Sequence, residues 1–226
     1  GLHSMNGVFC RVAASFNKKP QQSWKWRSFC VNGQGQEGKL VGRTFSALPE
    51  PAQYFESIDD LYFDATASFT EDVEHIVLDG IKNDRYPHGF LAEYAGGFDE
   101  SAYNKSPSEY LERVAHRVEK NDELFRKIRN RLSDAIKLAR RRAQWNYRAV
   151  VPQYYPKHNK MSLLLPLSLL SDLEIDAALV VQSERVDGQV HYQGYTIFPL
   201  SYAYRNARLV AKPISDWLNQ ERILGL

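Results

Sequence analysis

The spacing of apolar residues in the middle of the chain predicts two long helices. From residue 106 onward, apolar side chains recur at gaps of three, four and seven, which places them on one helical face: Tyr110, Val114, Val118, Phe125, Ile128, Leu132, Ile136 and Ala139. Ser106 is a suitable N-cap and is followed by Pro107 and, three residues after the cap, by Glu109. Asn121 caps well and fits poorly inside a helix, so we expect it to divide the run, which ends near Gln144.

The C-terminal third of the chain shows the pattern of an antiparallel meander. Segments 147–155, 161–169, 176–186 and 189–199 are rich in Val, Leu, Ile and Tyr, which favour strands. Asp187-Gly188 predicts a tight hairpin, because both central residues of such a turn need positive φ. Pro152 and Pro166 indicate sheet edges or bulges. Helices are expected over 201–211 and again from a cap at Ser215.

The first third is less regular. It predicts strands over 7–16 and 23–31, a glycine-rich loop over 33–38, a short helix over 52–61 and a strand over 62–69. A helix capped by Thr70 is expected to end at the turn 83–87. The predicted fold class is therefore α+β: an antiparallel sheet meander flanked by a long basic helix or helical pair and by C-terminal helices. We expect a single domain over 6–226, with 1–5 as a tag remnant and start methionine.

Composition indicates a globular chain outside the membrane. Of 226 residues, 43% are hydrophobic and 25% are charged, which suffices for a sizeable core. No run approaches the roughly 18 apolar residues of a membrane span. The two cysteines cannot form a disulfide framework, so we expect a cytoplasmic protein. Oligomeric state is left open.

Charge is strongly segregated along the chain, although the net charge is only +2. Segment 45–111 has three Lys/Arg against fourteen Asp/Glu, whereas 112–148 has twelve against five. The two segments either pack on each other or form separate faces. If the basic segment is exposed, Lys137, Arg140, Arg141 and Arg142 are candidate nucleic-acid contacts. We expect the three arginines to lie at a helix C-terminus, just before the strand that begins near Tyr147. The alternative to phosphate binding is that they complement the helix dipole there or pair with the acidic segment.

Two short segments are candidate ligand sites. Asn83, Arg85 and Tyr86 combine an amide, a planar guanidinium and a phenol in one turn. Tyr204, Asn206 and Arg208 lie at helical spacing near the C-terminus. The structural alternative for the first segment is a helix stop in which Arg85 pairs with an acid such as Asp79. The structural alternative for the second segment is a role in the packing of the core.

No motif predicts a metal, a cofactor or a catalytic nucleophile. With His3 of the expected tag remnant set aside, the remaining histidines show neither HxH nor HxxxH spacing: His75, His88, His116, His158 and His191. The chain has no CxxC and no GxSxG motif. Adjacent carboxylates such as Asp59-Asp60 do not face each other on a helix. We therefore expect no metal and no cofactor, and the catalytic residues stay unknown.

Several motifs together resemble a known family. They include Leu-Leu-Pro-Leu at 164–167, Tyr-x-Gly-x-Thr at 192–196 and Ala-Tyr-x-Asn-Ala-Arg-Leu at 203–209, with weaker pieces from Asn6 onward. The chain thus resembles a mainly bacterial domain of unknown function over about 6–218. Proteins of that kind often carry LOTUS-type winged helices or cold-shock modules, neither of which is evident here. The resemblance implies an RNA context by association and supplies no catalytic residue.

Three functions follow as hypotheses. The first is an RNA- or nucleotide-binding module of a bacterial protein, with single-stranded RNA or a nucleotide as partner, because cations and aromatic faces such as Trp24 and Trp26 are both present. The second is an enzyme acting on a nucleotide or phosphoester, with His75 as candidate base beside Arg85 and Arg208. The third is a protein-interaction domain with a broad exposed apolar patch. Whether the chain is an enzyme is left open.

Overall fold

A computed structural model describes residues 33–44, 55, 57–155 and 160–219. The chain divides into two compact units, Gly1–Gln53 and Tyr54–Leu226, so the expected single domain over 6–226 stays a prediction. The described part of the first unit is helix α1 (Gly35–Thr44). The loop predicted over 33–38 is therefore wrong from Gly35 onward, because the left-handed glycines Gly33 and Gly35 form a turn that leads directly into the helix. The strands predicted over 7–16 and 23–31 lie outside the described residues.

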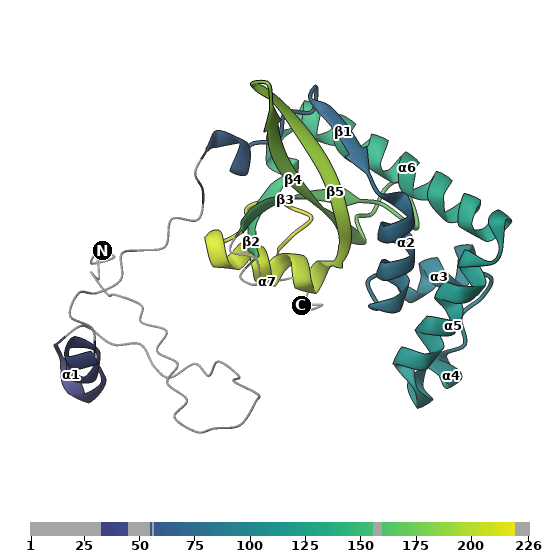
Figure 1. Cartoon of the computed structure of the whole chain (residues 1–226), viewed down its shortest axis with the longest axis horizontal. Coiled ribbons are helices and arrows are strands. Elements are labelled where there is room, and N and C mark those ends of the chain that lie inside the picture. The colour runs from purple at the N-terminus through teal and green to yellow at the C-terminus, as the bar shows by residue number, and fades with distance from the viewer. Residues whose placement is uncertain (1–32, 45–54, 56, 156–159, 220–226) are drawn as a thin grey trace. The chain divides into compact units, whose positions relative to one another are not determined.

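The second unit is built on a five-stranded sheet in the order β1-β5-β4-β3-β2 (Figure 1). The strands are β1 (Ser68–Glu71), β2 (Val151–Tyr155), β3 (Lys160–Leu167), β4 (Ala177–Val186) and β5 (Gln189–Pro199). The four C-terminal strands form the predicted antiparallel meander. Local turn chemistry explains its register: Asp187 and Gly188 both have positive φ in the β4–β5 hairpin.

The prediction of a purely antiparallel sheet is wrong at one edge. Strand β1 pairs with β5 in parallel, with Ser68 opposite His191 and Glu71 opposite Gly194, so the sheet is mixed. A tight hairpin requires antiparallel neighbours, but β1 and β5 are separated by five helices and three strands, and such a long connection permits either direction. The strand predicted over 62–69 is correspondingly short and begins only at Ser68.

Five helices precede the meander and bury the larger core on one face of the sheet (Figure 1). They are α2 (Val73–Lys82), α3 (His88–Tyr94), α4 (Glu100–Lys105), α5 (Pro107–Glu119) and α6 (Asp122–Trp145). The predicted division at Asn121 is confirmed: its side-chain oxygen accepts hydrogen bonds from the amides of Glu123 and Leu124, both at 3.1 Å. Asp72, rather than Thr70, caps α2.

The opposite face of the sheet carries a smaller core under helix α7 (Leu200–Val210). Val151, Leu164, Phe198, Ala203 and Trp217 are buried there. The helix predicted over 201–211 is confirmed, whereas residues 215–218 form a turn. Two 3-10 turns, η1 (Ile58–Asp60) and η2 (Tyr147–Ala149), lie where the sequence predicted part of a helix and the start of a strand. In the described ranges, no helix has the length and hydropathy that crossing a membrane needs.

Candidate nucleic-acid interface

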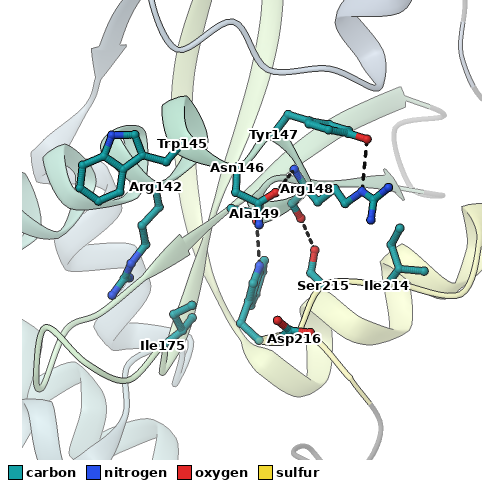
Figure 2. A pocket seen from close by; sticks show the side chains of 11 residues that line it. Arg142, Trp145, Asn146, Tyr147, Arg148, Ala149, Ile175, Ile214, Ser215 and Asp216 are labelled. Carbon is teal, nitrogen blue, oxygen red and sulfur yellow. Dashed lines mark hydrogen bonds between the residues drawn. The ribbon is translucent and has the colours of Figure 1, made fainter.

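A cleft of about 690 Å³ lies where α6 ends, and we call it the Trp145 cleft (Figure 2). One wall is formed by Arg142 and Trp145 of α6 and by residues 146–149, which include η2. The other wall is formed by Ile175 and residues 214–217. The cleft therefore joins segments that are about 70 residues apart in the sequence.

Two aromatic side chains at this cleft are unusually exposed. Trp145 is 85% exposed and Tyr147 is 59% exposed. Trp145 comes two residues after Ala143, the last buried position of α6, so it has left the apolar stripe and faces away from the core. Exposed aromatic rings are suited to stacking on planar ligands such as nucleobases, and the Tyr147 ring also lies 6.5 Å from the Tyr62 ring, centre to centre.

A cation lies beside the Tyr147 ring. The Arg148 Nε donates a hydrogen bond to the Tyr147 hydroxyl over 3.2 Å, and its guanidinium carbon is 5.6 Å from the centre of that ring. Asn146 holds the backbone in place, because its side-chain oxygen accepts from the amide of Arg148 at 3.0 Å. No described residue accepts a hydrogen bond from the two terminal nitrogens of Arg148, so they can serve a phosphate or carboxylate.

The second wall is fastened to the first through main-chain carbonyl groups. The Ser215 hydroxyl donates to the carbonyl oxygen of Arg148, and the Trp217 indole N–H donates to that of Ala149 over 2.7 Å. Trp217 itself is buried in the smaller core. The walls are thus held in place without a ligand, which lowers the conformational cost of binding. The same wall presents the exposed carboxylate of Asp216.

The predicted arginine cluster divides into three different roles. Arg140 donates from Nη2 to the carbonyl oxygens of Ala65 and Ala67, both at 3.0 Å, and its guanidinium carbon is 5.4 Å from the centre of the Phe69 ring. Arg140 therefore fastens the segment before β1 to α6. Arg141 is exposed to solvent.

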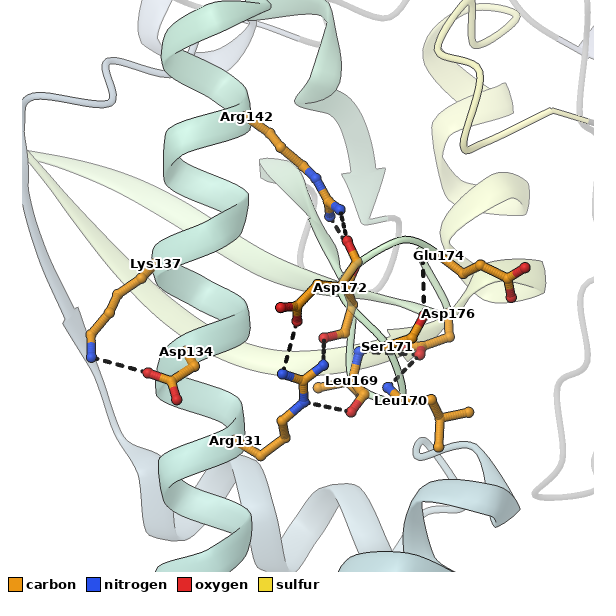
Figure 3. A network of polar contacts seen from close by, with 11 residues as sticks. Arg131, Asp134, Lys137, Arg142, Leu169, Leu170, Ser171, Asp172, Glu174 and Asp176 are labelled. Atoms are coloured by element: carbon orange, nitrogen blue, oxygen red, sulfur yellow. Dashed lines mark hydrogen bonds and ion pairs between the residues drawn. The ribbon is translucent and has the colours of Figure 1, made fainter.

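Arg142 fastens a different segment (Figure 3). It donates to the Ser168 hydroxyl at 2.8 Å and to the Asp172 carbonyl oxygen at 2.6 Å, and burial lowers its pKa. Three turns earlier on the same helix, Arg131 donates to the carbonyl oxygens of Leu169 and Ser168 and pairs with the Asp172 carboxylate at 3.0 Å. Together they hold the loop after β3 against α6, so Arg142 has a structural role as well as lining the cleft.

An exposed line of side chains leads along α6 to the cleft. Lys137, Arg141 and Trp145 are all exposed and are spaced by four residues, which places them on one helical face over about 12 Å. Lys137 also contacts Asp134, at 3.2 Å in an exposed i,i+3 pair of little energetic weight. Of the four predicted basic contacts, Lys137 and Arg141 are therefore the accessible ones.

The turn at 83–87 uses its three candidate residues separately. Asn83 Nδ2 donates to the carbonyl oxygen of Asp79 at 2.8 Å and so closes the end of α2. Arg85 donates to the Thr196 hydroxyl of β5, rather than pairing with Asp79, and lies 5.6 Å from the Phe198 ring centre. Tyr86 is buried in the larger core, and burial raises its pKa strongly. Asn83 is thus exposed, Arg85 half-buried and Tyr86 buried.

The C-terminal candidates and His75 lie on different elements. On α7, Tyr204 packs against the smaller core and Asn206 is half-buried, whereas Arg208 is exposed. His75 lies on the surface of α2, where Nδ1 is 3.2 Å from the Asp79 carboxylate. The Trp145 cleft contains none of these residues. No group of three His, Cys, Asp or Glu side chains that could hold a metal ion occurs within the part of the chain that the structure describes.

Sequence reasoning missed Trp145, Tyr147 and Arg148. A signal was present, because Trp145 falls off the apolar stripe of α6 and is followed within three residues by another aromatic and a cation. The hydrogen bonds of Ser215 and Trp217 could not be predicted from the sequence, because both acceptors are main-chain carbonyl oxygens, which every residue has.

The sequence model of the DUF3825 family, a domain of unknown function, matches residues 3–217 of the chain. The chain belongs to the DUF3825 family. The match includes every residue that lines the Trp145 cleft, so the cleft is part of the DUF3825 domain itself. No curated protein and no solved structure matches the chain significantly. The expected resemblance to a domain of unknown function is confirmed, while a bacterial origin and an association with LOTUS or cold-shock modules stay predictions.

Proposed function

We propose that this DUF3825 domain binds single-stranded RNA or a nucleotide in the Trp145 cleft. One observation carries the proposal: Trp145, 85% exposed, stands with Tyr147 and Arg148 around a cleft of about 690 Å³. Single-stranded nucleic acids are bound by stacking of bases on aromatic rings and by cations on the phosphates, and both groups are present here.

The distribution of charge supports one orientation of the ligand. Lys137 and Arg141 lead along α6 toward the cleft, and Arg148 lies at its rim, so phosphates are attracted to this side. The Asp216 carboxylate on the opposite wall repels phosphate and accepts hydrogen bonds from base N–H groups. Phosphates are therefore expected on the Arg148 side of the cleft, and base N–H groups are expected toward Asp216.

The proposal is one of binding without a catalytic step. The candidate base His75 lies on α2 and does not line the cleft. The two alternatives, an enzyme acting on a nucleotide or phosphoester and a protein-interaction domain, stay predictions.

A titration of labelled single-stranded RNA, followed by fluorescence anisotropy at several salt concentrations, tests the proposal. The Trp145→Ala variant is expected to weaken binding about 5- to 150-fold, the range expected for loss of one base stack of ~1–3 kcal/mol. Tyr202→Ala is the matched control, because Tyr202 is 48% exposed on α7 and lies outside the cleft. Absence of binding at low salt, or an equal loss in both variants, contradicts the proposal.

Salt dependence separates phosphate contacts from stacking. Arg148→Gln should reduce the slope of log K against log salt concentration by about 0.7, the value for one phosphate contact on a single strand. Trp145→Ala should lower the affinity and leave that slope unchanged, because stacking releases no counterion.

A further inference from the structure

A second, smaller hollow borders the Trp145 cleft. It measures about 350 Å³ and lies between β2 and the end of α7, so we call it the β2–α7 groove. Val150, Val151 and Pro152 line one side, and Ala207 and Val210 line the other. The two hollows have Tyr147, Arg148, Ile214 and Ser215 in common.

The lining of the β2–α7 groove suits an apolar group. The residues that line the groove are mostly aliphatic, and they include two cations, Arg148 and Lys212. The volumes of the two hollows, 690 and 350 Å³, both fall in the range of about 300–1,000 Å³ that is typical of small-molecule sites. Each is therefore large enough for a small ring system of its own.

The shared wall carries the group that a phosphodiester needs. Arg148 lines both hollows, and no described residue accepts a hydrogen bond from its terminal nitrogens. In a nucleic acid strand, a single phosphodiester joins each pair of neighbouring nucleosides. A cation between two base-sized hollows reproduces that order of base, phosphate and base.

We propose that the two hollows bind two consecutive nucleobases of one strand, with the linking phosphodiester on Arg148. This inference rests on the proposed function and narrows its ligand from single-stranded RNA or a nucleotide to an oligonucleotide of at least two residues. The first base stacks on Trp145 and the second enters the β2–α7 groove. Lys212, exposed in the lining of that groove, is available to the phosphate that follows the second base.

Ligand length tests the proposal directly on the full chain. Isothermal titration calorimetry compares adenosine 5′-monophosphate with the dinucleotide pApA. The dinucleotide is expected to bind about 5- to 150-fold more tightly, the gain that one additional base stack provides. This comparison needs no variant, so it does not depend on the folding of one.

A variant that fills only the groove provides the second arm. Ala211 is exposed, lines the groove and has an extended backbone, so Ala211→Trp places an indole there without changing the charge. The affinity for pApA should fall to that for the mononucleotide, while mononucleotide binding stays unchanged. Leu173→Trp is the control, because Leu173 is 92% exposed and lines neither hollow.

The outcomes distinguish this inference from the proposed function. Equal affinity for the two ligands, or tight binding of pApA by Ala211→Trp, overturns the two-base site and leaves RNA binding at the Trp145 cleft intact. Failure of the mononucleotide, pApA and longer single-stranded RNA to bind overturns both.

Discussion

The indole N–H of Trp217 donates a hydrogen bond of 2.7 Å to the carbonyl oxygen of Ala149. This bond joins the two walls of the Trp145 cleft, because Ala149 ends η2 and Trp217 belongs to the segment that closes the other side. The cleft therefore depends on a contact between residues 68 positions apart.

We expect Trp217→Phe to lower the free energy of unfolding by about 1–3 kcal/mol, because it removes the donor to Ala149 and part of a buried ring. It should also weaken RNA binding by loosening the cleft. Urea denaturation measures the first effect. Trp145→Phe is the control and should stay within about 0.5 kcal/mol of the parent, since Trp145 is exposed. Equal destabilisation by both variants would contradict the assignment of Trp217 as the structural tryptophan.

Neighbouring arginines of α6 should separate stability from binding. Arg142→Gln removes two hydrogen bonds to the loop after β3 and should cost about 1–3 kcal/mol. Arg141→Gln should change stability by less than about 0.5 kcal/mol and reduce the salt dependence of RNA binding. Thermal unfolding and the RNA titration measure the two effects. If Arg141→Gln destabilises the protein as much as Arg142→Gln, the division of roles within the arginine cluster is wrong.

Two glycines should respond in opposite ways to the same substitution. A Cβ at Gly80 would lie 2.5 Å from Cε2 of Tyr86. The Tyr86 ring is buried and stacked on the Phe90 ring, with 5.0 Å between the ring centres, so it has no room to move. Gly80→Ala should therefore destabilise the protein by about 1–3 kcal/mol. At Gly89 in α3 the nearest atoms, both of Leu170, would be 3.7 Å away, so Gly89→Ala should stabilise by up to about 1 kcal/mol. Thermal unfolding decides, and a neutral Gly80→Ala would show that Tyr86 is not held as described.

The carboxyl group of Asp64 should give a defined pH dependence. Hydrogen bonds from Thr66, first from the hydroxyl at 2.6 Å and then from the amide at 2.8 Å, lower the pKa of Asp64 below its ordinary value of 3.8. Because folding favours the ionised form, the stabilisation is fully present above that value and is lost as pH falls through the lowered pKa.

Thr66→Val removes the hydroxyl hydrogen bond, which has the larger effect on the pKa of Asp64. An NMR titration of the Asp64 carboxyl carbon should then show a pKa nearer the ordinary value. The variant should also be less stable than the parent at pH 7, with the difference shrinking as the pH falls below the ordinary value. An unchanged titration curve would show that the Thr66 hydroxyl is not the cause of the lowered pKa of Asp64.

Features that depend on local chemistry were predictable from the sequence. Asn121 divides α5 from α6, and Asp187-Gly188 turns β4 into β5, because a cap and a two-residue turn need only adjacent residues. The parallel pairing of β1 was not predictable, because it depends on the path of the helices between β1 and β5. The roles of Arg140 and Arg142 were equally hidden, since most of their acceptors are carbonyl oxygens of distant residues, a group that every residue carries. Within the site, only the exposure of Trp145 was predictable from the sequence, because this residue falls outside the apolar stripe of α6.

The most direct test of RNA binding in the Trp145 cleft is photo-crosslinking with a short single-stranded RNA that contains 4-thiouridine, followed by mass spectrometry of the peptides. If RNA stacks in the Trp145 cleft, adducts form on Trp145 or Tyr147 and are lost when unlabelled RNA competes. Adducts confined to α7, or none at either ring while the RNA is bound, would contradict this binding site.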